Sequence, residues 1–444
     1  MPNRPAAGVV ATVLCGLALI VAYLNKARCA GPPFTADGRS EMFDRIKDAQ
    51  VCYSDIQYLW LGRGINEHIF PYVTGGITPD GTLTGGAVEY PVLSGLIMWL
   101  GAAGAHDDAA FLLHSALLLA PFALVTAWLL GRLSGAAALL WAAGPPLVLY
   151  AFHNWELPVV CTSVAAVYVV ARPRRYTLRT KGILAAILLG VGFCLKLYPG
   201  IFVIPLALYV LVGEPGADRR RDVRGALAVL GAAVATVALI NLPFALAGYE
   251  GWRASFTFQQ LRQADITTNS IWYWGLRPLF DHGPHGEATF QNVVSTASPL
   301  LVLAAFALAV GLGWKRFQDT GEFPWVGVSG AMLCGFLLFH KVHSPQYTLW
   351  LIPFLVLLEV PWTAIGAYLV ADAAIGVGVF RYFYALGMGE PYQVEERVVV
   401  FGVWGRALLL VLLFFLFLRA RSRTPRESRP DASAESGELV GVAS

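Results

Sequence analysis

Side chains suited to acid–base and phosphate chemistry are gathered in a few short polar stretches of an otherwise apolar chain. Carboxylates occur at Asp55 and Glu89, and histidines with further charged residues occur in "FHNWE" (152–156) and "HKVHSPQ" (340–346). A carboxylate can accept a proton from a hydroxyl, while nearby cations stabilise a leaving phosphate. These residue types together suit a transfer reaction in which a hydroxyl is deprotonated as a phosphate departs.

The stretch "VCYSDIQYLWLGRGINEHIFPY" (51–72) mixes charged with aromatic side chains. A solvated loop does not need so many aromatic residues, and a core strand does not carry so many charges. We therefore expect this stretch to lie at a membrane surface and to hold something polar. Asp55 is its candidate catalytic base. The alternative is that Asp55 only caps a short helix beginning at Ile56, because Asp is a favoured N-cap.

Glu89 is the second candidate catalytic carboxylate, and it could instead form an ordinary salt bridge with Arg63. The candidates for binding a phosphate are Lys341, Arg262, Lys196 and His343. A planar guanidinium matches phosphate oxygens, which favours Arg262. Lys341 could instead be a lysine at the end of a span whose ammonium reaches the interface. The further site candidates are Tyr90, His153, Glu156 and His340.

The sequence predicts neither a metal site nor a cofactor. His340 and His343 are three residues apart, but no cysteine or carboxylate lies close to them in the sequence. A zinc site needs three or four such ligands.

Composition places the chain in a membrane. Hydrophobic residues make up 57% of its 444 residues and charged residues 14%, whereas soluble domains carry about 25% charge. The net charge of +3 is too small to suggest a nucleic-acid partner. We therefore expect an all-α polytopic protein of the cell membrane, in contact with membrane lipid.

A transmembrane helix needs about 20 apolar residues, or somewhat fewer where the bilayer yields. Hydrophobic runs predict spans near 8–24, 109–130, 135–151, 157–171, 225–247, 298–313, 325–339, 346–360, 363–384 and 398–418. The first run could also be read as a cleaved signal peptide, although "RCA" is a poor cleavage site.

Two apolar stretches do not fit the template of a single span. Residues 89–102 are too short to cross, so we expect an interfacial or re-entrant helix there. Residues 182–212 have basic clusters at both ends, and "KLYPG" provides a turn, which predicts a short hairpin that enters the membrane and returns. Lys196 would then stop within the membrane, where a lysine is costly and marks a candidate functional site. Alternatively, Lys196 reaches an interface.

Counting the hairpin as two helices gives about twelve membrane helices in one domain (1–418), with both termini cytoplasmic. Basic clusters near span ends mark the cytoplasmic side, and this topology places every such cluster there. The first external loop (25–108) carries juxtamembrane helices, and a second large external loop covers 248–297. Residues 419–444 are polar without an apolar face, so we expect a disordered cytoplasmic tail.

The six cysteines divide between the spans and the first external loop. Cys29 and Cys52 lie outside the expected spans and in an oxidising compartment, so we predict a disulfide between them. Cys15, Cys161, Cys194 and Cys334 read as small apolar residues of the spans.

Six ordered motifs, between about residues 50 and 355, resemble a known family. They are "CYSDIQYLWLGRGINEHIFPY", "VEYPVLSGLIMW", "FHNWELPVV", "LKLYPGIF", "NLPFALAGYEGW" and "HKVHSPQYTLWLIP". This pattern is similar to the actinobacterial glycosyltransferase family 87, of the multi-span GT-C superfamily. The family more often has Asp where this chain has Glu156.

The resemblance implies transfer of mannose or arabinofuranose from a polyprenyl-phosphate donor, outside the cytoplasmic membrane and usually without metal. An Asp of the first external loop is the base in such enzymes, and Asp55 occupies that place. The expected function is inverting transfer to a glycolipid or polysaccharide of the cell envelope. The alternatives are a lipid or sugar-lipid transporter (flippase), which would place polar residues on broken helices, and a non-catalytic assembly partner.

Overall fold

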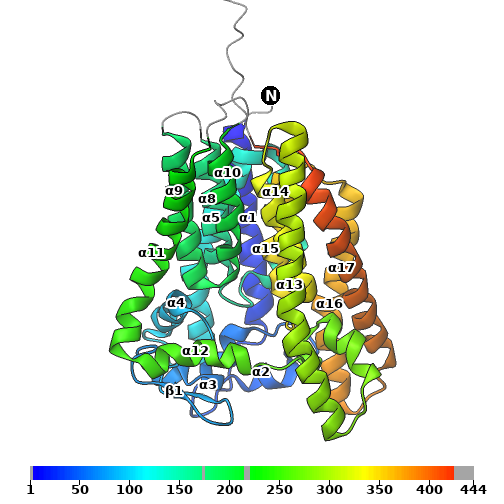
Figure 1. Ribbon diagram of the computed structural model, residues 1–444. Helices are drawn as coiled ribbons and strands as arrows, with labels where there is room; N and C mark the ends of the chain where they lie inside the picture. Colours follow the sequence, from blue (N-terminus) through cyan, green and yellow to red (C-terminus); the bar gives the residue numbers. More distant parts are fainter. Residues whose placement is uncertain (1–3, 173–175, 215–220, 425–444) are drawn as a thin grey trace, which may run out of the picture.

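The chain folds into a bundle of long and short helices with a layer of smaller elements at one end (Figure 1). The computed structural model describes residues 4–172, 176–214 and 221–424. Within these ranges, the regular structure other than helix is an antiparallel hairpin of β1 (Gly76–Ile77) and β2 (Leu83–Thr84). The prediction of an all-α polytopic membrane protein is confirmed. The expected tail reaches residues 425–444, which lie outside the described residues, as do parts of two expected basic loops.

Seven helical segments of the described residues are long and apolar enough to cross a membrane. They are α1 (Arg4–Ala27), α5 (Asp108–Ser134) continued through η2 (Gly135–Ala138) and α6 (Leu139–Ala142), α9 (Leu178–Leu195), α11 (Val223–Ala247), α13 (Pro284–Thr320), α16 (Trp362–Met388) and α17 (Gln393–Arg419). Large apolar side chains such as Leu239 and Leu246 of α11 are exposed on the outer faces. Helices that are apolar even on their outer faces suit lipid surroundings.

The remaining passes are short helices joined in pairs. They are α7 (Pro145–Tyr150) with α8 (Glu156–Ala171), η3 (Tyr198–Phe202) and α10 (Val203–Val212) returning from α9, and α14 (Trp325–Phe339) with η7 (Pro345–Tyr347) and α15 (Thr348–Leu357). At about 1.5 Å per residue, α8 and α14, with 16 and 15 residues, are shorter than a hydrocarbon core of about 30 Å. The hairpin predicted at 182–212 is confirmed, with its turn at Lys196.

One predicted span and two predicted external loops differ from the observed structure. The span expected at 135–151 is broken after Ala142, because Gly144 approaches the Leu140 carbonyl too closely to carry a side chain and two prolines follow it. The stretches 152–156 and 340–346, expected as external loops, are instead the turns of short helix pairs. Their side chains His153, Asn154 and Glu156 are buried, because these turns lie inside the protein.

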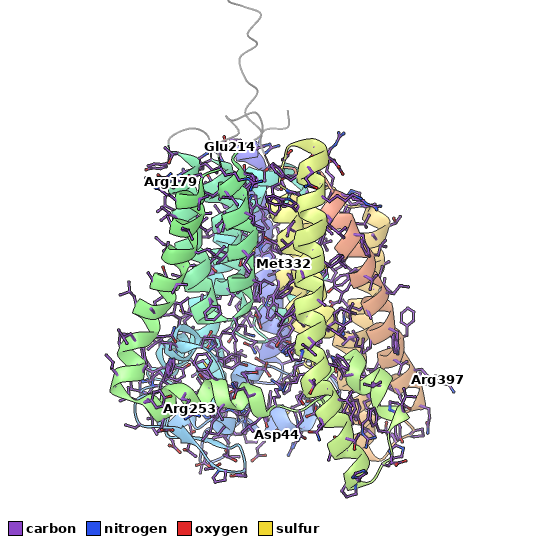
Figure 2. All side chains as sticks on the ribbon, in the orientation of Figure 1. Asp44, Arg179, Glu214, Arg253, Met332 and Arg397 are labelled. Carbon is purple, nitrogen blue, oxygen red and sulfur yellow. A yellow bond between two sulfur atoms is a disulfide. The ribbon has the colours of Figure 1, made fainter. Side chains whose placement is uncertain are left out.

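The outer layer is built from the segments expected as the two large external loops. It contains α2 (Glu41–Ile46), α3 (Asp55–Gly62), η1 (Ile65–Glu67), α4 (Val92–Ala102), α12 (Tyr249–Leu261), η4 (Ile266–Thr268), η5 (Trp272–Leu276) and η6 (Arg277–Leu279). In Figure 1, α12 crosses the lower end of the bundle between the ends of α11 and α13. Side chains labelled Asp44 and Arg253 lie at this end, and Arg179 and Glu214 lie at the other (Figure 2).

Both ends of the described chain lie at the same end of the bundle. The Arg4 guanidinium donates to the Leu133 carbonyl at 2.6 Å and to the Arg423 carbonyl at 3.2 Å. Because Arg4 begins α1 and Arg423 follows α17, the number of passes between them is even. This agrees with the expected count of about twelve.

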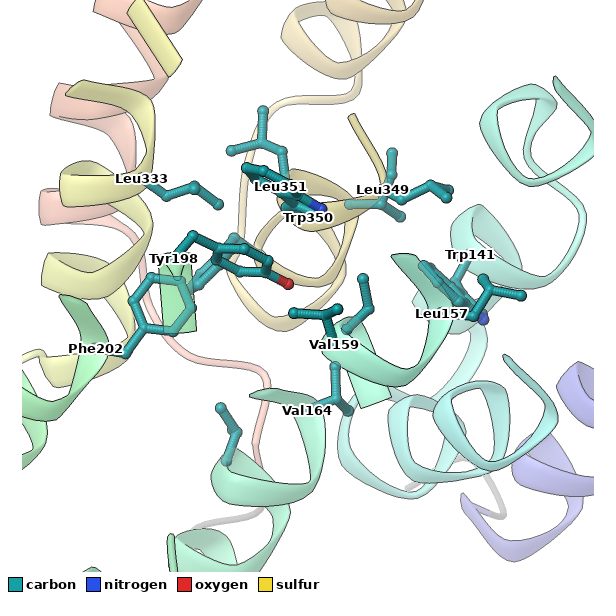
Figure 3. Close-up of a cluster of buried hydrophobic side chains, with 14 of the residues drawn as sticks. Trp141, Leu157, Val159, Val164, Tyr198, Phe202, Leu333, Leu349, Trp350 and Leu351 are labelled. Carbon is teal, nitrogen blue, oxygen red and sulfur yellow. The ribbon is translucent and has the colours of Figure 1, made fainter. Parts of the chain in front are cut away.

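Tightly packed aromatic side chains support the tips of the short helices (Figure 3). The rings of Tyr198 and Trp350 stack with centroids 4.2 Å apart, and Phe202 meets Tyr198 edge to face at 5.7 Å. Aromatic pairs of this geometry contribute beyond the area they bury. The turn at Lys196 is therefore held against α15 by a rigid contact.

The segment after α1 is closed by the predicted disulfide between Cys29 and Cys52, whose Cα atoms are 5.9 Å apart. That prediction is confirmed. The four other cysteines are free and buried. The disulfide lies one residue before Tyr53, so it fixes the approach of the chain to α3.

Candidate active site

A cavity of about 770 Å³ lies where the outer layer meets the tips of the short helices. Of the ten residues singled out in the sequence, seven line it: Asp55, Glu89, Tyr90, His153, Lys196, Arg262 and His340. Glu156 lies directly behind Lys196, whereas Lys341 and His343 are not part of the cavity wall. The fold therefore brings together residues that are far apart along the chain.

Asp55 is the first residue of α3, and it does not cap that helix. The Ser54 hydroxyl oxygen is the cap, accepting from the Ile56 N–H at 3.2 Å. The Asp55 carboxylate is therefore available to the cavity. Its Oδ1 accepts from the Tyr53 hydroxyl at 2.9 Å and its Oδ2 accepts from the Asn154 amide at 2.7 Å. Burial and the Asp55 charge raise the pKa of Tyr53 well above its ordinary value, so this hydroxyl keeps its proton.

Lys196 follows the last residue of α9 and turns its ammonium into the protein. Its Nζ contacts Glu156 Oε1, and the Trp350 indole donates to Glu156 Oε2 at 2.5 Å. The ammonium also lies over the rings of Tyr90 and Tyr347, at 5.2 and 5.4 Å from their centroids. Lys196 is 8% exposed. The alternative that it merely reaches an interface is wrong.

Asn154 and Tyr90 join the Asp55 side of the cavity to the Lys196 side. The Asn154 Nδ2 donates both to Asp55 Oδ2 and to the Tyr90 hydroxyl oxygen, each at 2.7 Å. Its Oδ1 accepts from the Trp155 N–H at 2.6 Å, so both donors and one of the two acceptor sites of the amide are used. Because the Tyr90 oxygen accepts from Asn154, its own proton is free to donate to a bound group. Burial and the Asp55 and Glu89 charges raise the pKa of Tyr90 well above its ordinary value.

Glu89 forms the salt bridge considered as its alternative role. Arg63 donates to its two carboxylate oxygens at 2.7 and 3.1 Å. The Gln259 amide donates to the Glu89 backbone carbonyl at 2.8 Å, which connects this pair to α12. The Glu89 charge is thus neutralised, whereas Asp55 is held by uncharged donors.

The cationic candidates of the outer layer are placed differently from one another. Arg262, which ends α12, lines the cavity. Lys341 donates to the Gln260 carbonyl at 3.1 Å and lies outside the cavity wall. Burial, with Arg262 nearby, lowers the pKa of Lys341. Lys341 was expected beside Arg262, but it is not part of the cavity wall. Its ammonium donates instead to the Gln260 carbonyl of α12.

The two histidines of "HKVHSPQ" are also separated. His340 lines the cavity and stacks on Phe336 at 4.7 Å. Burial lowers its pKa to about 4, so it is uncharged at neutral pH. His343 is buried behind the wall, where its backbone N–H donates to the Thr268 carbonyl at 2.7 Å. The His343 side chain, expected to bind phosphate, is therefore not part of the cavity wall.

Several residues around the cavity carried no clear signal in the sequence. Asn154 and Gln346 lie in turns that look like ordinary loops, and Tyr53 is one aromatic among many. Their importance comes from hydrogen bonds to Asp55, which only the folded arrangement creates. Among the described residues, no group of three or more His, Cys, Asp or Glu side chains is arranged to hold a metal ion.

A comparison with protein families decides the relationship of the chain. The family described as "Mannosyltransferase (PIG-M)" matches residues 151–417, which is more than half of the sequence. The chain belongs to the PIG-M mannosyltransferase family. In this family member, the matched part contains the cavity floor, with Asn154, Lys196 and Trp350. Asp55 and Tyr90 lie before it.

One solved structure similar to this PIG-M family member is ArnT from Cupriavidus metallidurans bound to undecaprenyl phosphate. The identity is 15% and the TM-score is 0.42, over 91% of this chain and 76% of that chain. At this level of similarity, no residue role passes from one chain to the other. None of the curated proteins matches the chain.

Proposed function

We propose that this PIG-M family member is an inverting glycosyltransferase that moves a sugar from a polyprenyl-phosphate donor to a hydroxyl of a cell-envelope glycolipid or polysaccharide. Family membership supports mannose as the sugar. The resemblance of the six motifs to glycosyltransferase family 87 keeps arabinofuranose as a second candidate. The observation that carries the proposal is one cavity with a carboxylate at one side and a buried lysine at the other, bridged by Asn154 and Tyr90.

The donor phosphate would lie against Lys196, with the Tyr90 hydroxyl and Arg262 as further donors. Lys196 is suited to this role because its ammonium is already inside the protein and costs no further desolvation. As the sugar–oxygen bond breaks, the leaving polyprenyl phosphate gains a negative charge. Positive charges and hydrogen-bond donors fixed in advance at that position lower the barrier. With Lys196 and Arg262 both facing the cavity, the proposal invokes no metal or cofactor.

Asp55 would act on the acceptor. Its carboxylate accepts the proton of the acceptor hydroxyl while that oxygen forms a bond to the anomeric carbon, on the side opposite the leaving phosphate. One bond to the anomeric carbon forms and one breaks, so the configuration inverts. The proton rests on Asp55 until the leaving phosphate or water takes it. The Tyr53 and Asn154 hydrogen bonds fix the orientation of the carboxylate before the acceptor arrives.

The cavity is proposed to open on the extracytoplasmic face, with both termini cytoplasmic. Arg179, Arg316 and Arg423, which belong to the basic clusters, lie at the end of the bundle that carries Arg4, which supports this orientation. The apolar side chains Leu197, Phe256 and Phe336 form part of the cavity wall. They suit the first units of a polyprenyl chain.

The test is transfer by the purified protein in detergent. Labelled polyprenyl-phosphate mannose and polyprenyl-phosphate arabinofuranose are supplied separately, with envelope lipids as acceptors. The proposal predicts a labelled lipid or glycan from one donor, and about 10² to 10⁴ times slower formation of it by the Asp55→Asn variant. Movement of donor across vesicles without any transfer in detergent would support the transporter alternative instead.

A further inference from the structure

The last turn of α1 places a lysine directly behind the proposed base. Lys26 is 2% exposed, although its position at the end of an apolar run is typical of a lysine that reaches the interface. Its Nζ donates to the Tyr53 carbonyl at 2.7 Å and lies 3.5 Å from His153 Nδ1. Among the ion pairs of the described residues within 4.0 Å, none includes Lys26. Its positive charge therefore acts on the Tyr53 carbonyl and on His153.

The lysine determines which nitrogen of His153 carries the proton. An ammonium has three donors and no acceptor, so while Lys26 is charged, the His153 Nδ1 that faces it is the unprotonated nitrogen. A neutral imidazole then carries its proton on Nε2. Burial, with Lys26 and Lys196 nearby, lowers the pKa of His153 well below its ordinary value, so the ring is neutral. The Nε2–H lies 4.0 Å from Asp55 Oδ2.

The contacts of Lys26 converge on Tyr53 and His153, which both contact Asp55. Tyr53 accepts from Lys26 through its carbonyl and donates to Asp55 through its hydroxyl. The His153 carbonyl accepts from the Asp55 backbone N–H at 2.8 Å. The ring of His153 also packs against the ring of Tyr53, with centroids 5.5 Å apart. The Cys29–Cys52 disulfide ties the end of α1 to this segment.

We propose that Lys26 is a positioning residue that fixes His153 as the Nε2–H tautomer and thereby orients the Asp55 carboxylate. The proposal rests on the proposed function, because Asp55 must be the base for its orientation to matter. In this arrangement the Tyr53 carbonyl accepts a hydrogen bond from the Lys26 ammonium and holds it in place. The ammonium fixes the tautomer of His153, and the Nε2–H of His153 then orients the Asp55 carboxylate. Without Lys26, the His153 ring is free to take the other tautomer, which presents a lone pair to the Asp55 carboxylate and repels it.

The experiment compares Lys26→Met and His153→Phe, alone and combined, in the full-length protein. Met fills similar space without a charge, and Phe keeps the ring packing of His153 without its nitrogens. Arg28→Met is the matched control, because Arg28 is an exposed cation two residues further on that contacts Asn25 and Gln50. Each variant is measured for kcat, for the donor KM and for the thermal midpoint.

Lys26→Met is expected to lower kcat by about 10- to 100-fold, the cost of a misplaced reacting group. The donor KM is expected to stay within about threefold, because the lysine that faces the phosphate is untouched. In the His153→Phe background, adding Lys26→Met is expected to change kcat by less than about twofold. Equal losses in both backgrounds would overturn the proposal, as would an equal loss in Arg28→Met.

A second readout does not depend on activity. Nitrogen-15 spectra of labelled histidine report which ring nitrogen is protonated, and the His153→Phe spectrum identifies the signal of His153. The proposal predicts Nε2–H in the wild type and a mixture or the other tautomer in Lys26→Met, or in Lys26→Gln should the first variant not fold. An Nδ1–H signal in the wild type would overturn it. Absence of sugar transfer by the wild type would instead count against the proposed function, while the spectrum still tests the tautomer.

Discussion

At the scale of single residues, the two candidate catalytic carboxylates, Asp55 and Glu89, differ in the groups that bind them. Asp55 is held by a hydroxyl and an amide, whereas Glu89 is paired with the Arg63 guanidinium. A base must be able to take up a proton, and a carboxylate locked in a two-point ion pair with arginine is poorly suited to that. This difference favours Asp55 as the proposed base.

Asp55→Asn is expected to lower kcat by about 10² to 10⁴, the usual contribution of a general base. Asn keeps the size of Asp but cannot accept a proton from the acceptor. The donor KM is expected to change little, because the carboxylate acts on the acceptor. Glu89→Gln is the matched control in the same cavity. A larger loss in Glu89→Gln than in Asp55→Asn would mean that the base has been assigned to the wrong carboxylate.

Lys196→Met is expected to weaken donor binding and also to destabilise the protein. Removing one partner of a buried ion pair costs about 3–5 kcal/mol, because the Glu156 carboxylate is left buried without its cation. The double variant Lys196→Met, Glu156→Gln removes both charges, so its thermal midpoint is expected to recover while donor binding does not. Recovery of donor binding together with stability would show that Lys196 has only a structural role.

At the scale of elements, the segment from the end of α1 to the start of α3 is a short closed loop. Cys29→Ser is expected to lower the free energy of unfolding by about 3 kcal/mol in the chain-entropy model for a loop of this length. Cys15→Ala, which removes a buried free thiol, is the control. Denatured, unreduced protein is expected to expose four thiols from its six cysteines, and a count of six would contradict the disulfide.

The order of the helices was predicted well from the sequence. How far each helix extends across the membrane was predicted poorly. An apolar run shows that a segment is in the membrane, but α8 and α14 give the same signal as full spans although they stop early. The hairpin at 182–212 was recognised because basic clusters flank both ends. The pairs α7–α8 and α14–α15 carry His, Lys and Glu residues only at their turns, and such turns resemble external loops.

The site was predictable where a residue is unusual in its surroundings, as Asp55 and Lys196 are. It was not predictable where a role depends on what packs nearby. Lys341 and His343 stand beside His340 in the sequence, but the turn directs them to the backbone of α12 and into the core. Lys26 looks like an ordinary end-of-span lysine until His153, 127 residues later, is placed against it.

At the scale of the whole molecule, the two ends of the bundle differ. One end carries the outer layer and the cavity, and the other carries Arg4 and Arg423, the first and nearly the last of the described residues. Glu214, at the end of α10, lies 3.8 Å from Lys181 near the start of α9, so both ends of the hairpin lie on one side. A cysteine at Glu214 is expected to be protected from a thiol reagent that cannot cross the membrane, whereas one at Arg253 is expected to react from outside. Labelling of intact cells tests this. External labelling at position 214 would show that the hairpin or the orientation is wrong.

The ion pair between Glu156 and Lys196 has a consequence for how the chain enters the membrane during synthesis. The two charges lie at the adjoining tips of successive helices, α8 and α9. An unpaired charge within a membrane-inserted segment is costly, so α8 with Glu156 alone and α9 with Lys196 alone would each insert less favourably than the two together. Entering together as one antiparallel unit, with the charges already paired, the two helices avoid most of that cost. The pair that holds the phosphate-facing lysine would then also set the order in which the bundle is assembled.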